Sequence, residues 1–467
     1  MKLFSQSLRD ELSSQAANEL ADKIQNKTAV IGIVGLGYVG LPIALEFSKQ
    51  GFKCIGVDLS KQKVEMLNRG ENYIEDLKDE EIAEIVHKGM FSVFSTFEPL
   101  ENADAIYICV PTPFNVNKDP DLAYVLGASE GVATTLKKGQ LVILKSTTFP
   151  GTTEDYMIPI LEKTGMKAGS DFFVAFSPER VDPGNKLFHT ANTPVVVGGI
   201  DNDSSIVAAM VNNAIIEKVY MVNNPKVAEL EKLLENIFRA VNIALVNELA
   251  LLCERMGGID VWEVVEAAST KPFGYMKFTP GPGVGGHCIP IDPYYLSWLA
   301  REYDFETKFI TLAANVNEGM PYHVVNHVVK VIAESPVAMK DARVLVVGVS
   351  FKKDVRDLRH SPAEAVIIRL IENGIHNIEV TDPWITGDGY AAAGKVFYSQ
   401  PISEEMLASY DAVILITDHS DYDIPFIVKH SKKVIDTRNM AKNITEDREK
   451  IIVLGSSPKK EKILMVH

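Results

Sequence analysis

One cysteine lies within an unusual loop, Gly281 to Pro293, which reads GPGVGGHCIPIDP. Four glycines and three prolines exclude the interior of a helix or of a central strand. Proline restricts the backbone of such a loop, and glycine allows a ligand to approach it closely. We therefore predict that Cys288 is a thiol that meets a ligand, with Asp292 close by in the sequence.

A thiol next to a redox cofactor has a specific use. It can add to an aldehyde to give a thiohemiacetal, which a nicotinamide cofactor oxidises to a thioester, and water then releases an acid. The attacking group must be a thiolate, and Lys232 or His287 could lower the pKa of Cys288. The other three cysteines, Cys54, Cys109 and Cys253, lie in apolar strand-like or helix-like runs and are predicted to be core residues.

The cofactor is indicated near the start of the chain. The apolar run Ala29 to Val34 is followed by GLGYVG and then by helical spacing, which is the context that a dinucleotide-binding GxGxxG requires. Asp58 ends the next apolar strand and is placed to bind a ribose hydroxyl, which favours NAD over NADP, although Lys61 and Lys63 follow closely. The alternative is a glycine turn kept for packing alone. The predicted NAD contacts in this region are Gly35, Leu36, Gly37, Tyr38, Val39, Gly40, Asp58 and Lys63.

Polar residues follow three further predicted strands. These strands are Ala105 to Val110, Leu141 to Lys145 and Phe172 to Phe176. In open α/β sheets, ligands bind beyond the carboxyl ends of strands. We therefore expect site residues at Pro111, Thr112, Thr147 and Glu179, the first three of them in contact with the cofactor. Helix capping by the Thr and Glu side chains is the alternative for each one alone.

A long helix is predicted from Asn224-Pro225 to Met256, because Asn suits an N-cap, Pro the first turn and Gly257 the exit. Its length of roughly 48 Å is typical of a helix that spans domains or a subunit interface. Lys232 and Asn236 are four residues apart and share a face. They either reach into a site or form a solvated pair beside the apolar stripe.

The last third of the chain is predicted to form a second α/β sheet. A strand and turn at Lys340 to Gly348 and a helix at Pro362 to Asn373 are followed by alternating strands and helices. Only Gly348 of a glycine fingerprint is present, so a second dinucleotide site is not expected. Basic side chains near the strand ends predict a phosphate-bearing ligand instead. They are Lys352, Lys353, Arg356, Arg359 and Arg438.

The length and net charge of the chain limit its possible domain organisation and binding partners. The chain has 467 residues and a net charge of −15, which excludes a general basic surface for nucleic acid. The predicted fold is α/β, with two Rossmann-like doubly wound domains joined by a long central helix. The predicted divisions are an N-terminal helical extension (1–27), an NAD-binding domain (28–222), a central helical region with the cysteine loop (223–320) and a C-terminal domain (321–467). Leu8, Leu12, Ala16, Leu20 and Ile24 form one stripe of a leading amphipathic helix.

Six motifs in order resemble one known family. After GxGxxG come SPE (Ser177–Glu179), ELEKLLEN (Glu229–Asn236), GGHCIPIDPYYL (Gly285–Leu296), FKKDVRDLR (Phe351–Arg359) and DTRN (Asp436–Asn439). Together they resemble the UDP-glucose/GDP-mannose dehydrogenase family of nucleotide-sugar 6-dehydrogenases over nearly the whole chain. His287 and Ile291 resemble the branch that acts on UDP-N-acetylhexosamines, above all UDP-N-acetylglucosamine. One departure is Asp182-Pro183-Gly184, where many relatives carry a second Glu.

The resemblance implies a role for each matching residue. Cys288 is the nucleophile, Lys232 and Asn236 stabilise the oxyanion, and Thr147 positions a water. Asp292 acts as base or orients water, and Glu179 takes part in thioester hydrolysis. The substrate-binding residues it implies are Glu179, Lys232, Asn236, Tyr275, Lys277, Gly285, Lys352 and Arg438, while Arg359 contacts ligand phosphates, including those of the cofactor.

The resemblance also implies an activity. The C6 hydroxyl of UDP-N-acetylglucosamine would be oxidised to the acid by two NAD, for a surface polysaccharide precursor. UDP-N-acetylmannosamine, UDP-N-acetylgalactosamine, UDP-glucose and GDP-mannose remain alternative substrates. Two rival functions are a two-electron dehydrogenase with a structural Cys288 and a non-catalytic NAD-binding protein. We expect a cytoplasmic homodimer formed through the long helix, with no metal, no nucleic acid and no membrane.

Overall fold

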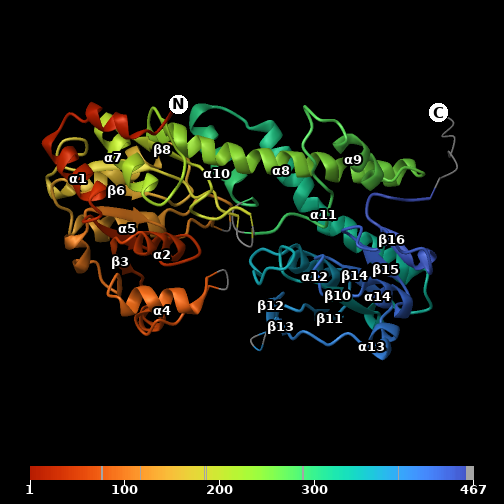
Figure 1. Cartoon of the computed structure of the whole chain (residues 1–467). Coiled ribbons are helices and arrows are strands. Elements are labelled where there is room, and N and C mark those ends of the chain that lie inside the picture. Colours follow the sequence, from red (N-terminus) through yellow and green to blue (C-terminus); the bar gives the residue numbers. More distant parts are fainter. Residues whose placement is uncertain are drawn as a thin grey trace. The chain divides into compact units, whose positions relative to one another are not determined.

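The computed structural model describes residues 1–74, 77–115, 117–182, 185, 187–286, 289–385, 387 and 389–458. The chain divides into two compact units, Met1–Glu235 and Asn236–His467. Each unit contains its own sheet with helices packed on it (Figure 1).

The first unit is built on a nine-stranded sheet. Six of its strands are parallel and follow the spatial order 3-2-1-4-5-6 of a dinucleotide-binding fold. In spatial order these six are β4 (Phe91–Phe94), β3 (Lys53–Val57), β2 (Val30–Val34), β5 (Ala105–Ile108), β6 (Leu141–Leu144) and β7 (Phe173–Phe176). β8 (Val195–Gly199) runs antiparallel to β7, and β9 (Val219–Val222) and β1 (Lys2–Leu3) complete the sheet.

Helices cover both faces of this sheet, which is why its central strands are apolar on both sides. One core lies beneath α1 (Gln15–Gln25), α2 (Gly40–Lys49), α3 (Lys61–Asn68), α4 (Asp79–His87) and α7 (Asn202–Asn213). The opposite core lies beneath α5 (Ala123–Ala133) and α6 (Ile158–Leu161). All four residues of β6 are buried, as are all four of β5 and of β7.

The N-terminal stripe forms two helical segments rather than one helix. A 3-10 turn occupies Gln6–Glu11, and α1 begins only at Gln15. The break has a cause far along the chain, because the carboxylate of Asp203 accepts hydrogen bonds from the backbone amides of Ser13 and Ser14. The Ser14 side chain then caps α1 by accepting from the amide of Ala17 at 3.2 Å.

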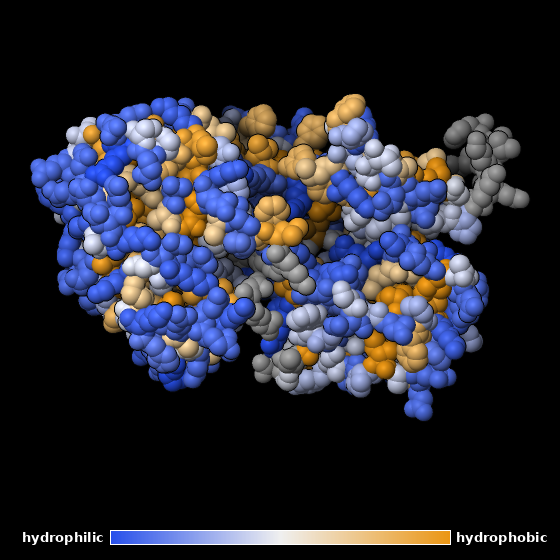
Figure 2. All heavy atoms as spheres, in the orientation of Figure 1, coloured by the Kyte–Doolittle hydropathy of each residue, from blue (hydrophilic) through white to orange (hydrophobic). Residues whose placement is uncertain are grey.

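The long helix is α8 (Pro225–Met256), and its bounds confirm the prediction. The Asn224 side chain accepts from the amide of Val227 at 3.0 Å, and Gly257 adopts a positive φ of 68° at the exit. By length and composition α8 is the one described helix that could cross a membrane, and 39% of its most apolar window is buried in the protein. Hydrophobic residues gather along the course of α8 in Figure 2.

The second unit is built on a five-stranded parallel sheet of order 2-1-3-4-5. In spatial order its strands are β11 (Asn377–Thr381), β10 (Arg343–Val347), β14 (Ala412–Leu415), β15 (Val434–Asp436) and β16 (Ile451–Val453). A hairpin of β12 (Tyr390–Ala392) and β13 (Lys395–Phe397) is separate. The predicted fold class, with two doubly wound sheets and a long helix, is confirmed.

Two pairs of helices cover the second sheet. α11 (Lys308–Ala333) and α12 (Pro362–Glu372) pack on one core, and α13 (Glu404–Ser409) and α14 (Ile424–His430) pack on the other. α9 (Val261–Ser269) and α10 (Asp292–Ala300) also belong to this unit. Because β10, β14 and β15 are parallel neighbours, their carboxyl ends lie next to one another at one edge of the sheet.

Candidate active site

The glycine turn after β2 has the local structure that its sequence demands. Gly35 has a φ of 89°, and its amide donates to the carbonyl of Val57 at 2.8 Å. A Cβ on Gly40 would lie 1.9 Å from the carbonyl oxygen of Gly35, so only glycine lets α2 begin this close to the turn. A Cβ on Gly37 would meet nothing within 4 Å. Open space beside a backbone amide at a helix start is where a pyrophosphate fits.

Asp58 lies directly beyond β3 and faces this turn. Its carboxylate accepts from the amide of Leu36 at 3.0 Å and from that of Ser60 at 2.9 Å. The Lys63 ammonium lies 3.8 Å from the Asp58 carboxylate and over the ring of Tyr73. The Asp58 side chain retains 13% exposure, so it remains within reach of a ribose hydroxyl. Tyr38 and Val39, between the glycines, lie on the rim of the turn, with Tyr38 exposed.

The polar residues beyond β5, β6 and β7 follow adjacent parallel strands, as predicted. Pro111 is exposed and Thr112 is buried beyond β5, while Thr147 is half-buried beyond β6. The Ser146 hydroxyl ties these two loops together by donating to the carbonyl of Val110 at 2.7 Å.

Glu179, beyond β7, has a partner that the sequence did not reveal. Lys145 has a side chain only 1% exposed, and its ammonium lies 3.6 Å from the Glu179 carboxylate. The other Glu179 oxygen accepts from the amides of Arg180 and Val181 at 2.9 Å. A buried ammonium and two amides therefore hold this carboxylate at the strand end.

The start of α8 is fixed to the loop beyond β6 by a buried carboxylate. Glu229 accepts from the amides of Gly151 and Thr153 at 2.6 and 2.8 Å, and from the Thr153 hydroxyl at 2.7 Å. Burial raises the pKa of Glu229 to about 7, against the lowering effect of these donors. The loop that holds Thr147 is thus tied to the helix that holds Lys232.

Lys232 itself is buried, with 8% exposure, so the alternative of a solvated Lys-Asn pair is wrong for this residue. Its neighbours Glu231 and Glu235 on α8 both bind the guanidinium of Arg180. Arg180 also donates to the carbonyl of Pro194 at 2.9 Å. Ion pairs with Arg180, which follows the SPE motif, therefore hold the first turns of α8 in place. These turns carry Lys232 within the first unit.

In the second unit, Asn236 and Asp292 come together. The Asn236 amide donates to the Asp292 carboxylate, which is buried at the start of α10. The predicted nucleophile Cys288 and its neighbour His287 lie outside the described residues, as do Pro183 and Gly184. The flanking residues on both sides of the cysteine, up to Gly286 and from residue 289 onward, are described.

The glycine-rich loop packs on the strand ends of the second sheet. A Cβ on Gly281 would lie 2.4 Å from the Arg438 guanidinium, and one on Gly285 would lie 2.8 Å from the Phe351 side chain. Gly286 has a φ of 90°, and its amide donates to the carbonyl of Arg359 at 3.3 Å. The glycines are therefore required by the close approach to residues that follow β10 and β15.

A buried amide network holds the beginning of the same loop. Asn247 on α8 accepts from the amide of Gly281 at 2.9 Å and donates to Asn317 on α11 at 2.9 Å. Asn317 in turn donates to the carbonyl of Ala240 at 3.0 Å. Because each amide both donates and accepts, this network fixes the loop at one geometry.

The FKKD segment beyond β10 carries Lys352 and is organised by a histidine. His419 is fully buried, accepts at Nδ1 from the amide of Asp354 at 2.9 Å, and lies with Nε2 3.1 Å from the Asp382 carboxylate. Because Nδ1 accepts an N–H, we assign the proton to Nε2, which donates to Asp382. Asp354 has a φ of 55°, so these contacts hold a strained turn.

Two predicted basic residues are partly engaged by their own surroundings. Arg359 forms a bidentate pair with Asp357, with contacts of 2.9 and 2.6 Å. Arg438 donates through Nε to the carbonyl of Ile416 at 3.1 Å, and burial lowers its pKa from the ordinary value. Its terminal nitrogens face Gly281.

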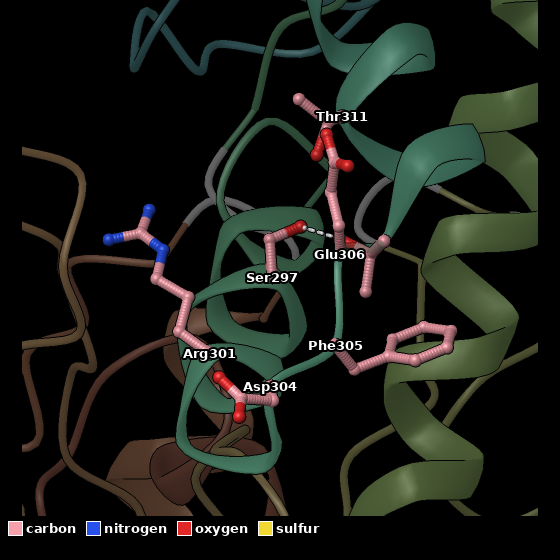
Figure 3. A pocket seen from close by; sticks show the side chains of 7 residues that line it. Ser297, Arg301, Asp304, Phe305, Glu306 and Thr311 are labelled. Atoms are coloured by element: carbon pink, nitrogen blue, oxygen red, sulfur yellow. Dashed lines mark hydrogen bonds between the residues drawn. The ribbon is translucent and has the colours of Figure 1, made fainter.

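Tyr275 and Lys277 lie in an exposed segment before the loop, and Lys277 pairs with Glu266 of α9. A separate pocket of about 440 Å³ lies between α10 and α11 and contains none of the predicted site residues (Figure 3). The hydroxyls of Ser297 and Thr307 bond across it at 2.6 Å.

Comparison with known proteins decides the family. Residues 29–223, 226–319 and 345–443 match the NAD binding, central and UDP binding domains of the UDP-glucose/GDP-mannose dehydrogenase family. The chain belongs to this family. It is an NAD-dependent dehydrogenase of nucleotide sugars, and the dinucleotide turn at Gly35 lies within the matched NAD binding domain.

Two curated relatives cover nearly the whole chain. A UDP-N-acetyl-D-glucosamine 6-dehydrogenase of Pseudomonas aeruginosa is 35% identical over 85% of this chain and 92% of its own. A UDP-N-acetyl-D-mannosamine dehydrogenase of Pyrococcus horikoshii is 34% identical over 88% of this chain and 96% of its own.

A solved structure gives the same result for the fold. The UDP-D-ManNAc dehydrogenase from Pyrococcus horikoshii superposes with a TM-score of 0.81 at 32% identity, over 91% of this chain and 99% of its own. The family and cofactor are thus established, while relatives carry names with different sugars.

The sequence analysis did not identify several residues that position the site. Lys145, Glu229, Asn247 and His419 are buried polar groups whose partners lie far along the chain. Lys145 ends the predicted strand Leu141 to Lys145, and His419 lies shortly beyond β14. A position at a strand end is the one sequence signal that could have marked them. Glu229 begins the ELEKLLEN motif, but nothing in the spacing of that motif indicated Gly151 as its partner.

Proposed function

We propose that the chain oxidises the C6 hydroxyl of UDP-N-acetylglucosamine to the carboxylate, in a four-electron reaction through Cys288. The observation that carries the proposal is the packing of Gly281 and Gly285 against Arg438 and Phe351. Gly281 and Gly285 precede Cys288 in the sequence, and both of their partners belong to the part of the chain that matches a UDP binding domain. The name of the Pseudomonas aeruginosa relative supports the choice of sugar.

The balanced reaction takes one alcohol, two NAD⁺ and one water to the carboxylate, two NADH and three protons. NAD, when bound, accepts a hydride in each oxidation. The Cys288 thiolate adds to the C6 aldehyde and forms a C–S bond, and the thiohemiacetal loses hydride to become a thioester. Water then attacks the carbonyl carbon, the C–S bond breaks, and the thiolate is restored.

The surrounding residues have distinct tasks in this proposal. The buried Lys232 ammonium stabilises the alkoxide and thiohemiacetal oxyanion, because a charge in a dry site acts strongly on developing negative charge. Asp292, oriented by the Asn236 amide, accepts the proton of the hydroxyl or of water. Thr147 positions water, and Glu179, held by Lys145, serves thioester hydrolysis.

The ligand-binding residues are proposed on the same basis. Lys352 and Arg438 contact the UDP-sugar, and Arg359 contacts ligand phosphates once its pair with Asp357 opens or is shared. Tyr275, Lys277 and Gly285 complete the substrate contacts.

The substrate is tested by NADH release from a panel of nucleotide sugars. We expect two NADH per UDP-N-acetylglucosamine and much lower kcat/KM on UDP-N-acetylmannosamine, UDP-N-acetylgalactosamine, UDP-glucose and GDP-mannose. A preference for UDP-N-acetylmannosamine would reassign the sugar and would agree with the Pyrococcus horikoshii relatives. One NADH per substrate with accumulating aldehyde would rule out the thioester route.

The nucleophile is tested by Cys288→Ser, with Cys253→Ala as the matched control. Cys253 is a buried thiol on α8 that the proposal does not use. We expect four-electron turnover to vanish in Cys288→Ser while NAD still binds, and to persist in Cys253→Ala. Unchanged turnover in Cys288→Ser would remove this cysteine from the mechanism.

We also propose a homodimer formed through α8, in the cytoplasm, where the uronic acid would enter a surface polysaccharide precursor. Exposed apolar residues recur along α8 at spacings of three, four and, once, seven residues, so they lie on one face of the helix. They are Val227, Leu230, Leu234, Phe238, Leu245, Leu249, Leu252 and Met256, and Leu234 is 63% exposed. A stripe of this length is typical of a helix that pairs with another. Light scattering should give a dimer for the wild type and a monomer for Leu234→Glu with Leu245→Glu.

A further inference from the structure

Three potential metal ligands converge where the end of α8 meets the middle of α11, within the second unit. Glu254 belongs to α8, and His323 and His327 lie four residues apart on one face of α11. The sequence in this region, HVVNH, gave no reason to connect the pair with a glutamate 69 residues before His323. These residues have no part in the proposed reaction.

The three donor atoms form a nearly regular triangle. Nε2 of His323 lies 2.8 Å from Glu254 Oε2, Nε2 of His327 lies 3.1 Å from the same oxygen, and the two Nε2 atoms are 3.2 Å apart. A tetrahedral zinc ion with bonds of about 2.0 Å separates its ligand atoms by roughly 3.3 Å. One face of such a tetrahedron therefore has nearly the dimensions that these side chains already show.

The surroundings orient the ligands. The second carboxylate oxygen of Glu254 accepts from the amide of Gly455 at 2.8 Å, and its backbone carbonyl accepts from the Ser457 hydroxyl at 2.8 Å. Contacts of this kind fix a ligating carboxylate from outside the metal.

A fourth ligand has access to the cluster. The carboxylate is 9% exposed, whereas the side chains of His323 and His327 are 23% and 12% exposed. The apolar residues next to them on α11, Val324, Val325 and Val328, are buried in the core of the second sheet. Solvent can therefore reach the imidazoles from outside, while the helix that carries them is held rigidly.

We propose that Glu254, His323 and His327 bind one divalent transition-metal ion of the zinc class, with a solvent molecule in the fourth position. Two imidazoles and one carboxylate suit Zn²⁺, Co²⁺ or Ni²⁺, and not Mg²⁺ or Ca²⁺, which take oxygen ligands. The ion ties α8 and α11 to the segment after β16 through Gly455 and Ser457. Its role is structural, since metal binding to preformed ligands stabilises the folded state.

The test uses the full chain with Cys288→Ser, so that this thiol cannot bind the added metal. Protein stripped with a chelator is titrated with Zn²⁺ by calorimetry and with Co²⁺ by visible absorption. We expect one equivalent bound with micromolar or tighter affinity, a Co²⁺ spectrum of a four-coordinate site and a raised Tm. His323→Gln should lose about tenfold or more in affinity, because a ligand is removed, whereas His376→Gln, an exposed histidine of the same unit, should lose none.

Glu254→Gln gives a second check, because it removes the charge and keeps the shape. The Tm of each metal-free variant shows whether it remains folded, so a lost site is distinguished from a lost fold. Absence of stoichiometric Zn²⁺ binding in folded protein would overturn the proposal and leave a hydrogen-bonded His-Glu-His cluster. Equal binding in His323→Gln and the parent would overturn it as well.

Discussion

The two sheets place a similar turn at the same point but use it differently. In both, a glycine with positive φ follows the first strand of the switch point, Gly35 at 89° and Gly348 at 83°, and an aspartate follows the neighbouring strand. Asp58 accepts one amide from its glycine turn and keeps an exposed edge, whereas Asp382 accepts the amides of Val349 and Ser350 and is fully buried.

The two aspartates differ in the groups that bind them. His419 donates to Asp382 and simultaneously accepts from the FKKD turn, so the carboxylate has become a structural group. In the described part of the first unit no histidine bonds to Asp58, and the carboxylate remains available to a ribose. The turn itself also differs, because α2 begins at Gly40 whereas α12 begins only at Pro362. The intervening residues of the second unit carry Lys352 and Arg359.

The sharpest test of the first turn is Gly40→Ala compared with Gly37→Ala. The Gly40 Cβ would meet the Gly35 carbonyl at 1.9 Å, so we expect a loss of about 2 kcal/mol or more in the free energy of unfolding. The Gly37 Cβ meets nothing, so Gly37→Ala should keep its Tm and lose about tenfold or more in NAD affinity. Thermal melts and NAD titration separate the two. Equal loss of stability in both would show that the turn is packed alike at each glycine.

The two aspartates give the next contrast. Asp382→Asn places an amide group against two backbone N–H donors in a dry site, and should cost about 2 kcal/mol of stability. Asp58→Asn should cost about 1 kcal/mol or less, but it should narrow the preference for NAD over NADP. Denaturant unfolding and cofactor titration are the measurements. A larger stability loss for Asp58→Asn would contradict the division of roles.

Much of this contrast was readable from the sequence, because local signals determine it. The glycine turn, Asp58 and the limits of α8 follow from Gly and Pro placement and from apolar runs that are buried on both faces. Around Gly348 the sequence lacks a second fingerprint, and the structure there has a longer turn that is bonded to His419. The core cysteines Cys54, Cys109 and Cys253 are buried as predicted.

The sequence did not predict the hydrogen-bond partners of buried polar groups that only the fold brings together. The Asp203 carboxylate binds the amide of Ser13, 190 residues earlier in the chain, and interrupts the expected N-terminal helix there. His419, which follows a neighbouring strand, accepts a hydrogen bond from the amide of Asp354. Glu254 meets two histidines on another helix. In each case a buried polar group binds a partner far along the chain, and neither periodicity nor spacing encodes such a pairing.

A smaller effect is expected from His419→Gln, which tests whether the second turn serves the substrate. Loss of the bond to the Asp354 amide should loosen the FKKD segment and raise KM for the UDP-sugar several-fold, with NAD affinity unchanged. Tyr422→Phe, which removes a hydroxyl bonded to the Thr381 carbonyl in the same region, is the matched control and should leave KM unchanged. A change in NAD affinity alone would contradict this assignment.

The smallest effect concerns acid. Burial alone would raise the pKa of Asp382, but the hydrogen bonds that it accepts from His419 and from the turn amides lower the pKa below the ordinary 3.8. A carboxyl whose pKa is lower in the folded state contributes stability above its unfolded pKa and loses it as pH falls through the folded value. Tm should therefore fall below about pH 4 in the wild type, and less steeply in Asp382→Asn. Parallel curves for the two proteins would show that Asp382 carries no charge that stabilises the second sheet.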